Sequence, residues 1–398
     1  MARYRLLMHG MQVNVDLPER WKVNYLPIRD IPALTEEGLR TAFANPVGSA
    51  RLSTLAKGKQ KAVIIVEDQT RPCPIPPLAK LIVEELREGG ITPDNIRFIM
   101  AVGGHKPMAG REFRLKLGDE VVKNFQVINP NPYENMVQVG TTPSGIPVEV
   151  DMAVAEADLK ISISALLPHN VAGYTGGGKM VLPGVCSMRT ITTHHYDPRI
   201  KAGQGGFGEV DCLFRAELEA AARVAGLDFV VEALLNPQLE IAGLWVGDMV
   251  AAHRAGARAA TEVHTVSGPA QVDVVIITGF PRDCELLQGM AVFAPHTGAH
   301  SVKKDGATLA LVAAPDGVGY HTLRDRDRKE ARPRAPLAKH SLLYSPNLSP
   351  WEANAAAPAG TVLYTRLEEA IDALANLFPV AEANVFPHGA MTIFQPRS

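Results

Sequence analysis

Three short apolar runs, each followed by a loop of charged, glycine or proline residues, most constrain the fold of this chain. The runs are KAVIIVED (61–68), NIRFIMAVGG (95–104) and DLKISISALLP (158–168). Apolar runs of this length are typical of strands buried on both faces of a parallel sheet. Helix-type segments lie between them, and alternating strands and helices predict a mostly parallel sheet with helices on both faces. We therefore predict an α/β protein whose first domain holds a Rossmann-like sheet.

The length of 398 residues predicts two domains, because single cores stop growing at about 250–300 residues. The Ser267-Gly268-Pro269 step precedes a new apolar run, VDVVIITGFP (272–281), and marks the predicted boundary. We expect an N-terminal domain over 1–266, which carries the candidate site, and a C-terminal α/β domain over 267–398. The active site is expected in the crevice between them.

The remaining elements are predicted from local pattern alone. Residues 1–25 resemble edge strands of the first domain, and 212–266 are predicted to be helical because of Ala-rich segments at 215–226 and 246–263. The lone histidines of that stretch, His253 and His264, are predicted to serve packing. Further elements are predicted as a helix near 36–45, a hairpin within 131–150, strands at 125–130, 307–314, 340–346, 361–365 and near 383–394, and a helix at 366–378.

Composition excludes several classes of protein. Forty basic against 42 acidic residues leave a formal charge of −2, whereas nucleic-acid binders usually carry a basic excess. The four cysteines form no CxxC pair and are typical of reduced thiols. The N-terminus lacks the apolar segment of a signal peptide, and no apolar run reaches about 18 residues. We expect a cytoplasmic protein without nucleic-acid or membrane partners; its oligomeric state is left open.

The candidate site lies in the loops that follow the three apolar runs. They are Asp68–Pro72, Gly103–Pro107 and a longer loop from His169 through three glycines to Lys179. Ligands of parallel sheets bind beyond the carboxyl ends of the strands, so these loops are predicted to converge on one crevice. Glycines allow close approach of the backbone to an anion, the lysine supplies a charge or a nucleophile, and histidines transfer protons or bind metals.

Three shorter patterns are weaker. Gly173–Lys179 matches the GxxxxGK core of a Walker A loop, but Met180 stands where Ser or Thr would bind Mg²⁺. The GxGxxG pattern at 203–208 does not follow a predicted strand, so it does not indicate a dinucleotide site. His296 and His300 have the spacing of ligands on a helix, but their APHTGAH context is a poor helix.

Taken together, the three loops resemble those of the lactate racemase family. Two motifs of the second half extend the resemblance over nearly the whole chain. The matching segments are Asp68-x-Thr70-Arg71-Pro72, Gly103-Gly104-His105-Lys106-Pro107, His169 to Gly184 with Gly176-Gly177-Gly178-Lys179, His195, Gly279-Phe280-Pro281 to Gln288, and Phe386-Pro387-His388-Gly389.

The resemblance implies a nickel-pincer nucleotide, which is a pyridinium-3-thioamide-5-thiocarboxylic acid mononucleotide whose sulfur arms hold nickel. It also implies a 2-hydroxy acid substrate and partner proteins that synthesise the cofactor. The implied roles are a covalent tether at Lys179, a nickel ligand at His195, an acid–base pair of His105 and His169, cofactor contacts from Asp68, Thr70, Arg71, Gly176, Gly177 and Gly178, and substrate contacts from Arg71 and Gln288. The role of His194 stays open.

The chemistry of inversion explains such a site. A carboxylate next to the reacting carbon disfavours a carbanion, whereas removal of hydride gives a 2-keto acid that can be reduced from either face. Loss of hydride requires loss of the hydroxyl proton, so each antipode needs a base, and two histidines suit this task. The cofactor accepts the hydride while the protein orients the substrate.

One segment departs from the family pattern. Lactate racemases usually read Leu-Tyr-Gln-x-x-Lys where this chain has Leu286 to Ala291, so Leu287 replaces the tyrosine and Ala291 the lysine. Loss of that cation predicts a racemase or epimerase for a 2-hydroxy acid or sugar acid other than lactate. The alternative is a nucleotide- or phosphate-binding protein, such as a degenerate homologue without racemase activity.

Overall fold

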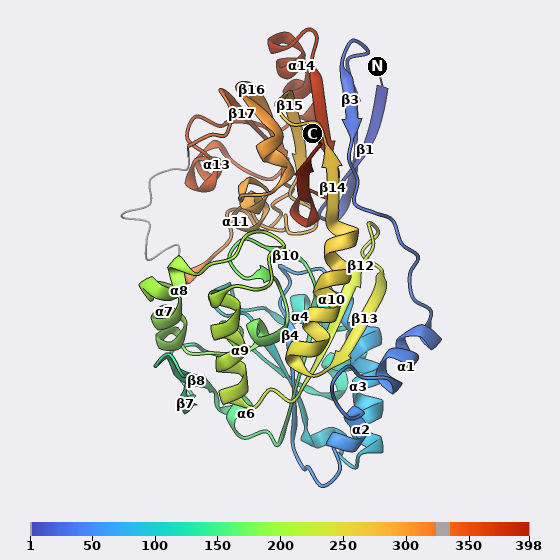
Figure 1. Cartoon of the computed structure of the whole chain (residues 1–398), viewed down its shortest axis with the longest axis vertical. Coiled ribbons are helices and arrows are strands. Elements are labelled where there is room, and N and C mark those ends of the chain that lie inside the picture. Colours follow the sequence, from blue (N-terminus) through green and yellow to red (C-terminus); the bar gives the residue numbers. More distant parts are fainter. Residues whose placement is uncertain (1, 324–334, 398) are drawn as a thin grey trace. The chain divides into compact units, whose positions relative to one another are not determined.

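The computed structural model describes residues 2–323 and 335–397; the charged run RDRDRKEARPR (324–334) lies outside the described residues. The chain divides into two compact units (Figure 1). One comprises residues 31–260, and the other comprises residues 1–30 together with 261–398. Each unit is described by itself.

The unit of residues 31–260 is built on a six-stranded sheet of order β13-β12-β9-β4-β5-β6. Five strands are parallel, and only the edge strand β13 runs antiparallel to its neighbour. All residues of β4 and β12 are buried, which explains their continuous apolar sequence. The strands are β4 (Ala62–Glu67), β5 (Ile96–Ala101), β6 (Gln126–Ile128), β9 (Leu159–Ala165), β12 (Phe229–Leu235) and β13 (Ile241–Gly247).

Helices cover both faces of this sheet, as the alternating pattern predicts. Figure 1 shows α3 (Ile75–Glu88) and α9 (Leu213–Ala225) on opposite sides of β4, the arrangement that right-handed crossovers produce. The apolar faces of both helices are buried. The other elements are α1 (Glu36–Ala44), α2 (Leu52–Leu55), α4 (Gly110–Leu117), α5 (Asp119–Asn124), β7 (Met136–Thr141), β8 (Pro147–Asp151), α6 (Met152–Ala155), β10 (Pro168–His169), β11 (Gly173–Tyr174), η2 (Gly177–Met180), α7 (Met188–Tyr196), α8 (Pro198–Ala202) and α10 (Met249–His264).

The helical prediction for 212–266 is wrong over residues 229–247, which form β12 and β13. Ala-rich flanks dominate the composition of the stretch, but FVVEALL itself is an apolar run of strand length. The Asn236 side chain accepts hydrogen bonds from the amides of Gln238 and Glu240 and closes the turn between the two strands.

The second unit also has a parallel six-stranded sheet, of order β18-β17-β16-β15-β19-β3. Its elements are β3 (Lys22–Tyr25), β14 (Thr265–Gly268), β15 (Val272–Thr278), α11 (Leu286–Gly289), η3 (Met290–Phe293), η4 (Gly298–Ser301), β16 (Val302–Leu311), β17 (His340–Tyr344), α13 (Pro350–Ala356), β18 (Val362–Tyr364), α14 (Leu367–Leu377), β19 (Glu382–Phe386), η5 (Gly389–Met391) and β20 (Ile393–Pro396). The predicted final strand is therefore two strands, β19 and β20.

The N-terminal residues belong to this second unit, whereas the sequence predicted them within a first domain of 1–266. Strand β3 pairs with β19. The hairpin of β1 (Ala2–Met8) and β2 (Met11–Leu17) buries Leu6, Met8 and Val15 in the core of the unit. The pairing of β3 with β19 joins residues far apart in the chain, so no local pattern predicts it.

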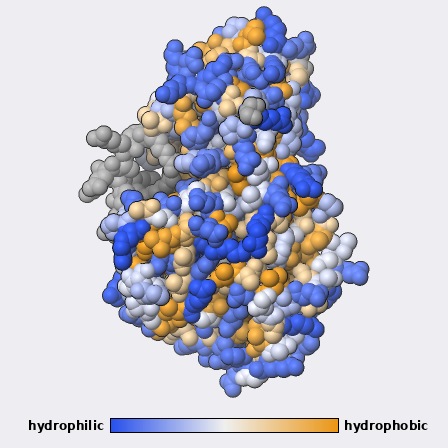
Figure 2. Space-filling view, viewed as in Figure 1, coloured by the Kyte–Doolittle hydropathy of each residue, from blue (hydrophilic) through white to orange (hydrophobic). Residues whose placement is uncertain are grey.

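Within the described ranges, no helix combines the length and apolar character needed to cross a bilayer. On the face shown in Figure 2, hydrophilic and hydrophobic residues are interspersed over both units.

Candidate active site

The three candidate loops begin at the carboxyl ends of three adjacent strands. Strand β4 lies between β9 and β5, and all three are parallel, so their carboxyl ends meet at one edge of the sheet. Asp68 follows β4, His105 follows β5 and His169 follows β9. The backbone amide of Gly103 donates to the carbonyl of Gly184 (2.9 Å), which ties the β5 loop to the segment after Lys179.

Asp68 and His105 form a direct pair. Nδ1 of His105 lies 2.6 Å from Oδ2 of Asp68. The other carboxylate oxygen accepts from the backbone amide (2.9 Å) and hydroxyl (2.5 Å) of Thr70, and the Arg71 guanidinium donates to the Thr70 hydroxyl (2.7 Å). Because the carboxylate accepts, Nδ1 of His105 carries the proton, and Nε2 of the neutral ring is the proton acceptor.

Burial sets the charges of this pair. Desolvation alone would raise the pKa of Asp68, but His105, Arg71 and Thr70 outweigh it and hold that pKa well below its usual range. Desolvation lowers the pKa of His105 despite the attraction of Asp68, and the ammonium of Lys179 acts in the same direction. At neutral pH the pair is therefore an ionised carboxylate with a neutral imidazole, which is the state of a general base.

A second buried pair, Lys116 and Glu67, holds the loop that follows β4 and was not predicted from the sequence. Lys116 donates to Glu67 (2.8 Å) and to the carbonyls of Arg71 (2.6 Å) and Cys73 (3.1 Å). Glu67 also accepts from the backbone amides of Cys73 (2.7 Å) and Ala165 (2.8 Å). These contacts fix the loop that carries Asp68 and Arg71 against strand β9.

The glycine–lysine loop, defined as residues 173–179, packs closely on protein. Gly176 and Gly177 have positive φ values of 80° and 58°, which favour glycine. A Cβ on Gly178 would lie 2.7 Å from the carbonyl oxygen of Leu218 in α9. From the sequence, these glycines were explained by close approach of the backbone to a ligand. The structure gives a second explanation, which is close packing of the loop against α9 and its neighbours.

Three buried ionisable groups hold this loop, and none of them was predicted as a site residue. Arg215 of α9 donates to the carbonyls of Ala172, Tyr174 and Gly176. Glu232 of β12 accepts from the backbone amide of Gly177 (2.6 Å). His253, predicted to serve packing, has its Nε2 2.9 Å from the carbonyl oxygen of Thr175.

His169 differs from His105 in its hydrogen bonds. Its Nδ1 accepts from the backbone amides of Val171 and Ala172, each at 3.3 Å. A neutral His169 in this conformation therefore carries its proton on Nε2. The two histidines thus offer opposite groups at Nε2, an acceptor on His105 and a donor on His169.

His194 and His195, on α7, have different surroundings. His194 is fully buried, and its ring packs edge-on against Phe214 with centroids 4.7 Å apart. His195 is half-buried, and its Nδ1 lies 2.9 Å from the carbonyl oxygen of Ile191, which makes Nε2 the ring atom available to a ligand. Burial lowers the pKa of His195 to about 4, and the charge of Lys179 adds to the effect. Lys179 thus acts electrostatically on both His105 and His195.

Gln288 belongs to the second unit, on α11. It is buried, and its side-chain oxygen accepts from the guanidinium of Arg282 (2.8 Å). Leu287 is buried beside it, and Ala291 follows on η3. The alternative metal pair does not share one helix: His296 lies in a turn with a φ of 67°, and His300 lies in the short helix η4. Across the described ranges, no three His, Cys, Asp or Glu side chains group so as to hold a metal.

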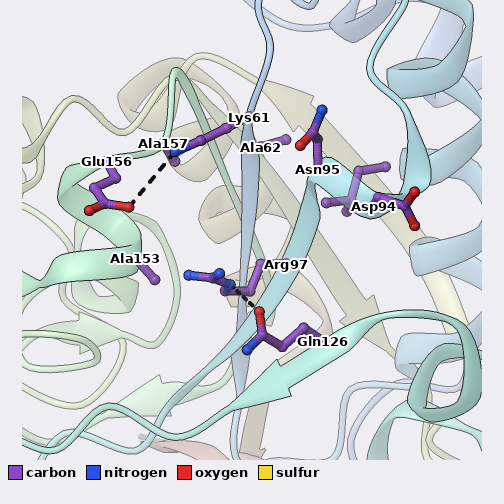
Figure 3. Close-up of a pocket in the computed structure, with 10 residues that line it drawn as sticks. Lys61, Ala62, Asp94, Asn95, Arg97, Gln126, Ala153, Glu156 and Ala157 are labelled. Carbon is purple, nitrogen blue, oxygen red and sulfur yellow. Dashed lines mark hydrogen bonds and ion pairs between the residues drawn. The ribbon is translucent and has the colours of Figure 1, made fainter.

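A surface pocket lies at the other edge of the first unit's sheet (Figure 3). Its lining includes Lys61 and Arg97, near the amino ends of β4 and β5, and Glu156. Arg97 donates to Gln126 (2.7 Å) within it. Because it lies away from the carboxyl ends of the strands, it is not part of the candidate site.

The fold and these contacts define an α/β protein with a candidate acid–base site at the carboxyl edge of a parallel sheet. Residues 9–205 match the family model of the lactate racemase N-terminal domain. The chain is 34% identical over 304 residues to the lactate racemase of Lactiplantibacillus plantarum, a match that covers 73% of this chain and 70% of that protein. It is 31% identical over 290 residues to the lactate racemase of Thermoanaerobacterium thermosaccharolyticum, covering 71% of this chain and 67% of that protein.

A solved structure agrees with the sequence comparisons. The lactate racemase apoprotein from Thermoanaerobacterium thermosaccharolyticum superposes with a TM-score of 0.77 at 25% identity, covering 99% of this chain and 100% of that chain. The chain belongs to the lactate racemase family. This relationship supports an isomerase of the racemase type, and the predicted family and α/β fold are confirmed.

Proposed function

We propose that this protein is a racemase or epimerase that inverts the α-carbon of a 2-hydroxy acid with a nickel-pincer nucleotide tethered to Lys179. The observation that carries the proposal is the grouping of an Asp68–His105 pair with a lysine whose charge acts on both His105 and His195. A proton acceptor, an amine for covalent attachment and an imidazole for metal ligation are the three protein groups that this chemistry requires.

The donor set fits the proposed cofactor. Nδ1 of His195 is engaged by a backbone carbonyl, the usual arrangement of a metal-binding histidine, so Nε2 is suited to nickel. The sulfur arms of the proposed cofactor would supply further donor atoms to a metal held by His195. When bound, the cofactor supplies the hydride acceptor.

The protein residues handle the proton of the substrate hydroxyl. Nε2 of His105 accepts it, and Asp68 orients the ring and stabilises the imidazolium that forms. In the observed conformation the Nδ1 atom of His169 accepts from two backbone amides, so a neutral ring carries its proton on Nε2 and can donate there. To act as the base for the opposite antipode it must give up the two amide contacts at Nδ1, so the two directions of inversion begin from different hydrogen-bond arrangements.

The substrate side of the proposal concerns Arg71 and Gln288. The forked guanidinium of Arg71 suits a carboxylate, and we expect the side-chain amide of Gln288 to contact the substrate as well. Leu287 and Ala291 make the segment around Gln288 more apolar than a tyrosine and a lysine would. We therefore propose a 2-hydroxy acid other than lactate, with a larger or more apolar side chain.

The test requires protein produced in a host with the cofactor-synthesis pathway. Intact-mass measurement should show an adduct that is absent from Lys179→Ala, and elemental analysis should find nickel. A panel of single-enantiomer 2-hydroxy acids and sugar acids should then include one that loses optical purity. The lactate racemase of Lactiplantibacillus plantarum, produced in the same host, is the control for cofactor supply. An adduct on that control but none on this chain would refute the proposal and favour a nucleotide-binding or degenerate homologue, whereas efficient racemisation of lactate would refute only the non-lactate preference.

A further inference from the structure

One peptide group in the glycine–lysine loop is held at both ends by buried charged side chains. The carbonyl of Gly176 accepts from the guanidinium of Arg215 (2.9 Å), and the amide of the same peptide, on Gly177, donates to Glu232 (2.6 Å). Arg215 and Glu232 are both fully buried. A cation at the oxygen end and an anion at the hydrogen end match the dipole of the peptide, so they favour one orientation of it.

The fit around this peptide is close. A Cβ on Gly176 would collide with Oε2 of Glu232, and a Cβ on Gly177 would lie 3.0 Å from the His253 ring. Ser164 on β9 donates to the same Oε2 (3.1 Å) and fixes the carboxylate. Rotation of the peptide would turn its oxygen toward Glu232 and its amide toward Arg215, so the clamp opposes it electrostatically as well as sterically.

The clamped peptide is connected to Lys179 by one further hydrogen bond. The backbone amide of Lys179 donates to the carbonyl of Gly176 (3.2 Å), the oxygen that Arg215 also contacts. Lys179 begins the segment that returns to Gly184, whose amide donates to the Lys179 carbonyl (3.4 Å). The backbone position of Lys179 therefore depends on the orientation of the Gly176–Gly177 peptide.

We propose that Glu232 and Arg215 form a charged clamp on the Gly176–Gly177 peptide, and that the ionised carboxylate of Glu232 is the form that positions Lys179. Glu232 is thus a positioning residue, which acts through the peptide and not on substrate. The part that concerns chemistry at Lys179 rests on the proposed function; the clamp itself does not.

The charge of the clamp changes near neutral pH. Desolvation raises the pKa of Glu232 to about 7, and Glu67 at the end of β4 adds to the rise. The amide of Gly177, the hydroxyl of Ser164 and the charge of Arg215 oppose it. His253 on α10 has a pKa far below its usual range because of burial, and burial raises the pKa of the Cys73 thiol, so both stay neutral as Glu232 titrates. Above pH 7 the carboxylate therefore makes a charge-assisted hydrogen bond to Gly177, which is stronger than a neutral one.

Amide hydrogen exchange of the full-length apoprotein tests the clamp without any assumption about activity. The measurement is the protection factor of the segment 175–181, corrected for intrinsic exchange, between pH 5.5 and 8.5. In the wild type it should rise at least threefold with a midpoint near pH 7, because a local opening that leaves Glu232 buried deprives its carboxylate of the Gly177 amide. Global unfolding hydrates Glu232 and has the opposite pH dependence. In Glu232→Gln, whose amide oxygen still accepts from Gly177, it should stay at the low-pH value throughout.

A matched control is available on α9. Glu217 is another buried carboxylate, which accepts from Ser144 (2.5 Å) and Thr142 (3.4 Å), so Glu217→Gln should keep the wild-type pH profile in 175–181. A flat wild-type profile would overturn the proposal. So would a Glu232→Gln profile that follows the wild type, because the ionised carboxylate would then be unnecessary.

A second measurement connects the clamp to Lys179. In the cofactor-producing host, Glu232→Gln should carry the adduct at a level at least fivefold below the wild type at pH 8, with Glu217→Gln at the wild-type level. An equal adduct level in Glu232→Gln would overturn the positioning role. Absence of adduct from the wild type would instead overturn the proposed function, and the exchange profiles would still decide on the clamp.

Discussion

Replacement of Glu232 by glutamine should stabilise the unit of residues 31–260 at alkaline pH. The carboxyl of Glu232 has a pKa of about 7 in the folded protein against an ordinary value of 4.5, so the shift is about 7 − 4.5 = 2.5. A pKa difference of one corresponds to about 1.36 kcal/mol. Ionisation of Glu232 in the folded protein therefore lowers the free energy of unfolding by roughly 3 kcal/mol. Glutamine has nearly the same shape as the protonated acid and carries no charge, so it avoids this cost.

The sign of the effect follows from proton linkage. A raised folded-state pKa means that the folded protein binds the proton more tightly than the unfolded chain does. The associated stability is present below pH 4.5 and is lost as the pH rises to 7. Wild type and Glu232→Gln should therefore have similar unfolding free energies at pH 4.5 and differ by roughly 3 kcal/mol in favour of the variant at pH 8.5.

Urea unfolding at several pH values measures this difference. Trp245 is the only one of the three tryptophans that lies in the unit of residues 31–260, so a background with Trp21→Phe and Trp351→Phe makes fluorescence report on that unit. Glu217→Gln in the same background controls for removal of a buried carboxylate. A difference between wild type and Glu232→Gln that stays constant from pH 4.5 to 8.5, or a variant less stable at pH 8.5, would refute the reasoning.

Three further substitutions test other parts of the site. Asp68→Asn replaces the charged acceptor of the His105 Nδ1 proton with a neutral amide and should lower kcat, expressed per mole of adduct, roughly 100-fold; an unchanged kcat per adduct would contradict the pair. Gly176→Ala, at a φ of 80° and against Glu232, should cost more than about 2 kcal/mol in urea unfolding, whereas Gly58→Ala, at a φ of 75° with open space around it, should cost about 1. Ala291→Lys should raise kcat/KM for lactate relative to that for the preferred substrate, and an unchanged ratio would count against Ala291 as a cause of selectivity.

Local pattern was sufficient where strand, loop and helix follow one another directly in the chain. Apolar runs predicted β4, β5 and β9, and the rule that parallel strands share a carboxyl edge predicted that the loops of Asp68, His105 and His169 begin at the same edge. This inference depends only on strand order and direction, both of which the alternation of elements indicates.

Pattern failed where distant segments determine the structure. Strand β3, near the N-terminus, pairs with β19, near the C-terminus. The sequence of a short polar strand does not indicate which strand it pairs with. Residues 229–247 were predicted as helix because helical flanks with many alanines outweigh a short apolar run, although FVVEALL is fully buried in the sheet. Tertiary burial, and not intrinsic propensity, decides such short segments.

The buried residues that hold the site loops were not predicted, although the sequence contains a feature that indicates them. Glu67 and Glu232 are the only acidic residues in two otherwise apolar strands, β4 and β12. A lone carboxylate in a buried strand is costly unless it has hydrogen bonds or a cation, so it indicates a partner contributed by another part of the chain. The partners of Glu67 are the amide of Cys73, just after the Asp68–Pro72 loop, and Lys116 on α4. The partner of Glu232 is the amide of Gly177 in the glycine–lysine loop.

The two carboxylates have different electrostatic roles because only one has a cation in direct contact. Glu67 contacts the ammonium of Lys116 at 2.8 Å, and together they hold the loop of Asp68 and Arg71. Glu232 contacts a peptide amide, and the charge of Arg215 reaches it only from the other end of that peptide. Desolvation raises the pKa of Glu232 to about 7, whereas His105, Arg71 and Thr70 outweigh desolvation and hold the pKa of Asp68 well below its usual range. The Asp68 side of the site is therefore expected to keep its charges across the physiological pH range, and the Lys179 side is expected to change with pH.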